Sequence, residues 1–172
     1  MSHDMDVPER TCPQCGRPLV GHDRNVRFRL PDPVLSSPDQ ERAEGTWMTD
    51  PDPIEAVMMQ VPHIGPFVRC LLPVQLTGGY KVTFGVWMAV HPDELQRIAR
   101  AWHAPEYNEL RFDSWLANAL PVFGLLATPA IAGVRDPDAT PYVESSSDGK
   151  LRDVLTREWP HEELLSALDE PE

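Results

Sequence analysis

Residues 67–90 read FVRCLLPVQLTGGYKVTFGVWMAV, which is two apolar runs joined by a short polar one. The runs over residues 67–76 and 81–90 are rich in Val, Leu and Phe, residue types that favour β-strands. Gly78 and Gly79 lie between the runs, and glycine reaches the positive φ that tight hairpin turns need. This stretch therefore predicts an antiparallel β-hairpin at the centre of the fold.

Further elements are predicted on both sides of the hairpin. Val26, Phe28 and Leu30 alternate with Arg, which indicates a strand over residues 24–30 with one wet face. Apolar residues at helical spacing predict helices from Pro92 to the residue before Pro105, over 148–159 and over 161–168. Additional expectations are a short helix from Ser37 to Gly45, a strand or helical turn over 54–61, a helical turn over 112–120, and strands over 122–134 and 140–145.

These elements predict an α+β fold in a single domain over residues 12–168. We expect a mainly antiparallel sheet with helices packed on one face and an N-terminal CxxC knuckle. The polar residues 1–11 are expected to form a flexible leader, and residues 169–172 an acidic tail.

The charge of the chain and its distribution favour some classes of function and argue against others. The 172 residues hold 27 acidic and 15 basic side chains, a net charge of −12, which argues against non-specific nucleic-acid binding. Residues 136–172 hold eleven acidic against three basic residues, a net charge of −8. This predicts either a solvated helical surface with a frayed tail or an acidic face for a partner with a basic surface. The chain has no apolar run long enough to span a membrane and no secretion signal, which predicts a cytoplasmic protein that does not enter membranes.

The N-terminal sequence Cys12-Pro-Gln-Cys15-Gly has the form of a zinc knuckle. Zinc needs about two further ligands to complete a tetrahedron, and the candidates are Cys70, His22 and His63. Two alternatives are a knuckle that has lost its metal and a redox CxxC motif. Cys70 is otherwise expected to be an ordinary buried thiol.

A second candidate site lies on and beside the central hairpin. Arg69 and Asn118 are polar residues among apolar neighbours, and with Trp87 and Trp115 they predict a pocket for a small ligand. The alternative is that Arg69 simply faces solvent from its strand. The carboxylates of Asp50, Asp52 and Glu55 are close in sequence, a pattern suited to acid–base chemistry or to a solvated loop.

Several of these segments occur in an order that resembles a known family. They are CPQCG from residue 12, FVRCL from residue 67 followed by Pro73-Val74, FGVWM from residue 84 and WLANALP from residue 115. The chain resembles the bacterial uncharacterised family known as domain of unknown function 2199, over about residues 12–168. The resemblance implies no activity, but it implies that characteristic family positions are occupied by Arg69, Cys70, Gly85, Trp87, Trp115, Leu116 and Asn118.

The chain departs from the pattern of that family at three places. Members often have a His where this chain has Leu19, and another Cys within the segment that matches residues 46–54. The His-Pro pair that often follows a Glu-rich strand in members is replaced around residues 144–147. The first two departures remove residue types that would ligate a metal.

Two hypotheses for function follow from the sequence. The first is a non-enzymatic, acidic protein-binding or regulatory domain with a structural zinc knuckle. The second is a small-ligand-binding protein or enzyme whose pocket contains Arg69, Trp87 and Asn118.

Overall fold

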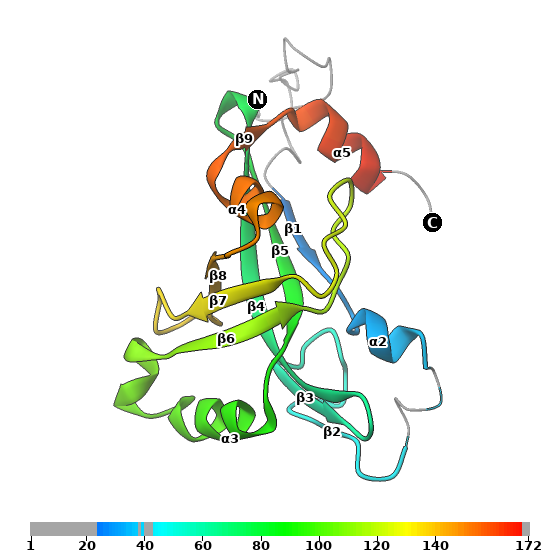
Figure 1. The fold of residues 1–172 in the computed structure, drawn as a ribbon, viewed down its shortest axis with the longest axis vertical. Helices are drawn as coiled ribbons and strands as arrows, with labels where there is room; N and C mark the ends of the chain where they lie inside the picture. The colour runs from blue at the N-terminus through cyan, green and yellow to red at the C-terminus, as the bar shows by residue number, and fades with distance from the viewer. Residues whose placement is uncertain (1–23, 38, 40–42, 170–172) are drawn as a thin grey trace, which may run out of the picture.

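The computed structural model describes residues 24–37, 39 and 43–169, and the predicted hairpin lies at its centre (Figure 1). Strand β4 (Gly65–Leu76) pairs antiparallel with β5 (Lys81–Ala89) in one continuous register. In the turn between them, Thr77–Gly79, both Gly78 and Gly79 have a φ of +82°. Glycine thus supplies the left-handed backbone of this turn, and the hairpin prediction is confirmed.

Five strands close into a barrel in chain order. The strands β6 (Arg111–Leu116), β7 (Pro129–Gly133) and β8 (Tyr142–Ser145) follow β5, each antiparallel to the one before it. Strand β8 then pairs with β4 through Leu71 and Tyr142. This closing pair is parallel because a meander with an odd number of strands brings its last strand back parallel to its first. The sheet is mainly antiparallel, as expected, but it closes on itself.

Four short strands extend the sheet beyond the barrel. Strand β1 (Arg24–Arg27) lies parallel to β5, and β9 (Glu158–Trp159) lies parallel to the end of β4. Strand β3 (Met58–Val61) pairs antiparallel with the beginning of β4, and β2 (Trp47–Met48) pairs with β3. The central hairpin is therefore covered by further strands along much of its length.

Alternation along β4 places its side chains in two separate clusters. Val68, Cys70 and Leu72 belong to the large cluster that includes the barrel interior. Phe67, on the opposite face, packs in a second cluster with Trp87. Because both faces of β4 are covered, its sequence is apolar almost without interruption.

The longer helices lie at the two ends of the barrel and not, as expected, together on one face of a sheet, because the sheet closes on itself. Helix α3 (Pro92–Ala101) buries Leu95 and Ile98, and Figure 1 shows it at the end opposite α4 and α5. Helix α4 (Gly149–Thr156) lies within the range 148–159 predicted for it, although the end of that range forms β9 instead. Helix α5 (His161–Asp169) matches the prediction over 161–168 and ends one residue later. A single helical turn, α2 (Asp32–Leu35), follows β1. No helix in the described part of the chain is long and apolar enough to cross a membrane.

Two sequence predictions are wrong. The segment 112–120, predicted as a helical turn, provides most of β6, because Phe112, Ser114 and Leu116 alternate as buried residues along a strand. The segment 122–134, predicted as one strand, is a loop followed by β7. The helix predicted from Ser37 lies partly outside the described residues.

Tyr107 gives the fold a pH-dependent contribution to stability. Its side chain lies in the 3-10 turn Pro105–Glu109, and its hydroxyl donates to the carbonyl of Ala139. Burial, followed by the effect of Cys70 and Asp136, raises the pKa of Tyr107 to about 12. An unfolded Tyr titrates near pH ~10, so this contribution is complete below about pH 10 and is lost as the pH rises toward about 12.

We therefore expect a steeper loss of stability at high pH in the wild type than in Tyr107→Phe. The measurement is the free energy of urea unfolding of both proteins between about pH 9 and about pH 12. Parallel pH profiles for the two proteins would show that the Tyr107 hydroxyl does not titrate with folding.

Candidate functional site

The Arg69 side chain is fully buried and held by main-chain carbonyls. It extends from β4 with 0% of its surface exposed. Its guanidinium donates to the carbonyl oxygens of Pro53 (2.8 Å), Gly85 (2.9 Å), Ala56 (3.3 Å) and Phe28. Burial, and then the charge of Arg27, lowers the pKa of Arg69 to about 9, which leaves the guanidinium protonated at neutral pH.

Trp87 lies against this arginine, Asn118 binds Trp87, and both residues are equally buried. The guanidinium carbon lies 4.1 Å from the centroid of the Trp87 ring, in cation–π geometry. The Asn118 Oδ1 accepts from the Trp87 main-chain N–H at 2.8 Å. The Asn118 Nδ2 donates to the Leu30 carbonyl at 2.9 Å and to Asp32 Oδ1 at 3.1 Å. We call Arg69, Trp87 and Asn118 the Arg69 clamp.

The Arg69 clamp holds chain segments that precede and follow the central hairpin against that hairpin. The alternative that Arg69 faces solvent is wrong, because none of its surface is exposed. The structure brings three of the four predicted pocket residues together, but their polar atoms bind the protein's own backbone. Trp115 lies apart on β6, with its ring edge-on to His91 at a centroid distance of 5.0 Å. A ligand would reach the clamp only if these segments separated.

The predicted zinc site falls mainly outside the described residues. Cys12, Cys15 and His22 lie there, whereas Cys70 is a free thiol in the buried core and His63 lies exposed in the turn before β4. Burial raises the pKa of the Cys70 thiol well above its usual range. Among the residues that the structure describes, no three His, Cys, Asp or Glu side chains are grouped to hold a metal ion.

Zinc at Cys12 and Cys15 stays a prediction with a direct test. We expect protein purified without an affinity metal to contain zinc, and Cys12→Ser to contain much less, because zinc binds the thiolate. Elemental analysis of both proteins measures this. Equal and negligible zinc in the two samples would reject the site.

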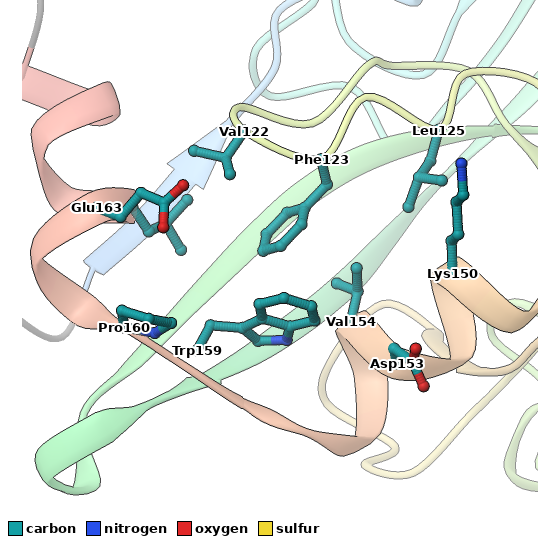
Figure 2. A pocket seen from close by; sticks show the side chains of 10 residues that line it. Val122, Phe123, Leu125, Lys150, Asp153, Val154, Trp159, Pro160 and Glu163 are labelled. Atoms are coloured by element: carbon teal, nitrogen blue, oxygen red, sulfur yellow. The ribbon is translucent and has the colours of Figure 1, made fainter.

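A cavity of about 320 Å³ lies between the loop over residues 117–128 and the helices α4 and α5 (Figure 2). We call it the α4–α5 groove. Most of its lining is apolar, and a few charged side chains stand among the apolar ones. The lining residues are Val122, Phe123, Leu125, Lys150, Asp153, Val154, Trp159, Pro160, Glu163 and Leu164.

The loop that forms one wall of this groove is conformationally strained. Three of its non-glycine residues have left-handed backbone, with φ of +72° at Val122, +73° at Leu125 and +70° at Ala127. Such a conformation costs an L-residue about 1–2 kcal/mol and is especially unfavourable for a β-branched side chain. Val122 has this unfavourable backbone although 52% of its surface is exposed to solvent. Strain of this kind is concentrated at functional sites, where neighbouring structure maintains it.

Trp159 contributes a buried hydrogen-bond donor to the groove. Its ring meets that of Phe123 edge-on, with centroids 4.8 Å apart, and Figure 2 shows the indole nitrogen on the edge of the ring turned away from Phe123. This N–H is buried and has no acceptor among the described residues. An unsatisfied buried donor costs about 1–3 kcal/mol, so an acceptor would gain that interaction where a shift of the ring or of its surroundings let it reach the N–H.

The rigid side of the groove is formed by the C-terminal helices. His161, at the start of α5, is buried, and its Nδ1 lies 2.8 Å from Thr77 Oγ1 and 3.0 Å from the Thr77 carbonyl oxygen. This contact fixes α5 to the turn of the central hairpin. Glu163 on α5 and Asp153 on α4 then place carboxylates on the groove, where Lys150 also lines it and Arg157 pairs with Asp153 at 3.4 Å. The arrangement is suited to binding an apolar group with positive charge beside it.

The sequence alone did not identify this groove. Phe123 lies in the apolar run over residues 122–134 that the sequence predicts as a strand, and Trp159 lies at the end of the helix predicted over 148–159. Pro121 and Gly124 bracket Val122 and Phe123, and that pairing is a turn signal which could have located the loop. Positive φ at Val122 and the missing acceptor of Trp159 have no signature in the sequence.

Comparisons with known proteins give one result. A family model described as uncharacterized protein conserved in bacteria (DUF2199) matches residues 11–154. No curated protein and no solved structure matches the chain.

Proposed function

We propose that this chain, which belongs to the bacterial family of uncharacterized proteins DUF2199, is a binding domain for a basic segment of a partner protein. The α4–α5 groove receives one apolar side chain of that segment. Acidic residues around the groove contact its flanking Lys or Arg residues. The proposal places this activity in the cytoplasm, where a free thiol such as that of Cys70 stays reduced.

The observation that carries the proposal is the buried N–H of Trp159 in an apolar groove. A peptide main chain has a carbonyl at every residue, so a side chain inserted beside Trp159 brings an acceptor with it. The volume of about 320 Å³ is at the small end of the range of about 300–1,000 Å³ typical of small-molecule sites. That size favours a few side-chain atoms over a large cofactor.

The charge around the groove supports a basic partner. Asp153 and Glu163 line it, and Glu158 and Glu162 are exposed on the neighbouring β9 and α5. Lys150 is the one basic side chain in the described lining. Opposite charge at the rim speeds association and orients the partner more than it adds affinity. The proposal joins the acidic character predicted for the C-terminal segment to this apolar anchor site.

An array of short peptides tests this proposal. Each peptide carries one central Leu, Phe or Trp flanked by Lys and Arg, and a matched set carries Glu in the flanks. We expect binding of the basic set, weakened by salt, and at least about tenfold weaker binding to Val122→Lys, which places a cation at the groove. Leu126→Lys is the control, because Leu126 is 47% exposed on the same loop but does not line the groove.

A charge-matched pair of triple variants separates local from overall charge. Neutralising Glu158, Glu162 and Glu163 to Gln is expected to slow binding. The control combines Glu106→Gln, Glu109→Gln and Asp113→Asn. It removes the same charge elsewhere and is expected to leave the rate of binding unchanged. Equal binding of basic and acidic peptides, or equal effects of the two loop variants, would reject the proposal. Binding of a neutral apolar compound in place of every peptide would make the groove a small-ligand site.

A further inference from the structure

A second cavity, of about 440 Å³, lies between the β2–β3 strands and the C-terminal end of α3. Figure 1 shows these elements at the end of the molecule opposite α4 and α5, so the cavity is separate from the α4–α5 groove. It is lined by Trp47, Thr49, Asp50, Glu55, Val57, Met58, Ala99, Trp102 and His103. We call it the Trp47 cavity.

Two indole rings line this cavity in different ways. Trp47 is on the short strand β2 and is 45% exposed, which is unusual for so large an apolar side chain. Trp102 follows α3 and is only partly exposed, because its ring is held edge-on to Tyr107 with centroids 5.1 Å apart. The cavity therefore offers one accessible and one fixed aromatic ring.

The described lining of the Trp47 cavity contains two carboxylates and one imidazole, that of His103. Asp50 and Glu55 line it, and its described lining contains no Lys or Arg. Asp50 Oδ1 accepts from the Asp52 main-chain N–H at 2.9 Å, which orients the carboxylate within the loop. The nearby Arg27 donates to the main-chain carbonyls of Ile54 and Glu55 and is not part of the lining. Glu55 is an exposed residue, and its carboxylate also acts electrostatically on the buried Arg69 guanidinium.

We propose that the Trp47 cavity binds a small organic ammonium ion with apolar substituents, such as a quaternary ammonium compound. Indole faces attract cations through their negative quadrupole and tolerate the methyl groups of such an ion. The two carboxylates supply the opposite charge. A metal ion is a poorer match, because indole rings do not ligate metals and no metal-binding group of three His, Cys, Asp or Glu is found among the described residues.

Choline and its neutral isostere 3,3-dimethylbutan-1-ol test the site as a matched pair of probes. The two compounds have the same shape and differ by one charge. Titration is followed through the indole N–H resonances of the protein and by calorimetry. We expect saturable choline binding, with the neutral isostere binding about tenfold more weakly or not at all, since cation–π contacts and charge both favour the cation.

Variants of exposed residues localise the binding without disturbing the fold. We expect Trp47→Ala to weaken choline binding about fivefold or more and Glu55→Gln to weaken it about threefold. The controls are Leu35→Ala, an apolar residue 55% exposed elsewhere, and Glu109→Gln. Equal affinity for the isostere, equal effects of Trp47→Ala and Leu35→Ala, or no saturation with choline in the wild type would overturn the proposal. None of these outcomes bears on peptide binding at the α4–α5 groove.

Discussion

Replacement of Arg69 by Met is expected to lower the free energy of unfolding by about 3–5 kcal/mol. The variant removes a guanidinium that binds four main-chain carbonyls and stacks on Trp87. Methionine fills similar space, so the loss comes from buried carbonyls that lose a donor, although the Gly85 carbonyl still accepts from the Phe28 N–H at 3.1 Å. Replacement of a buried charge by an apolar side chain is harmless only when its partners are replaced as well. The partners of Arg69 are backbone carbonyls, which remain in any side-chain variant.

Two further variants make the Arg69 prediction specific. Arg69→Lys is expected to destabilise the protein almost as much, because one ammonium group cannot reach carbonyls on several segments. Arg111→Met is the matched control: Arg111 is exposed and pairs with Glu144 at 3.1 Å, so it should cost less than about 1 kcal/mol. Urea unfolding measures all three. An Arg69→Met protein as stable as Arg111→Met would show that water or a rearranged backbone satisfies the carbonyls.

Replacement of Asn118 by Ala is expected to cost about 2–4 kcal/mol. The Asn118 amide satisfies the buried N–H of Trp87 and binds the Leu30 carbonyl and Asp32. Alanine leaves the Trp87 N–H without that acceptor and removes one of the contacts that hold the segment around Leu30, while the Asp32 N–H still donates to the Ala117 carbonyl at 2.7 Å. The segment is then also held by the contact of Asp32 with the Ala119 N–H at 2.7 Å.

Asn108→Ala is the control for this second prediction, because Asn108 is exposed in the 3-10 turn after α3. Urea unfolding is combined with amide hydrogen exchange, which should speed up near Leu30 in Asn118→Ala and stay unchanged in Asn108→Ala. Slow exchange near Leu30 in both variants would mean that the Arg69 clamp does not hold this segment.

The central hairpin could be predicted because its information is local. The apolar runs and the Gly78-Gly79 turn define β4 and β5 within 24 residues. The barrel could not be predicted in the same way. Its closure depends on the single parallel pair of Leu71 with Tyr142, residues 71 positions apart in the chain. No periodicity in the sequence shows that a strand so distant returns to β4.

The same difference between local and tertiary information decides how much of the candidate sites could be predicted. Arg69 and Asn118 were recognised as polar residues in apolar surroundings, but sequence does not show whether such a residue faces a ligand or a backbone carbonyl. The α4–α5 groove arises from the meeting of Phe123 on a loop with Trp159 after α4. Only the tertiary structure shows this contact between the two rings, and only it shows that the Trp159 N–H has no acceptor among the described residues.

The central claim is that the N–H of Trp159 binds a partner's acceptor in the α4–α5 groove. The most direct measurement is the indole N–H resonance of Trp159, assigned by its loss in Trp159→Phe, as the tightest basic peptide of the array is added. We predict a downfield shift of that resonance, as expected for a newly formed hydrogen bond, that saturates with peptide binding and is absent in Val122→Lys. Tight peptide binding that leaves the Trp159 resonance unmoved would contradict the account.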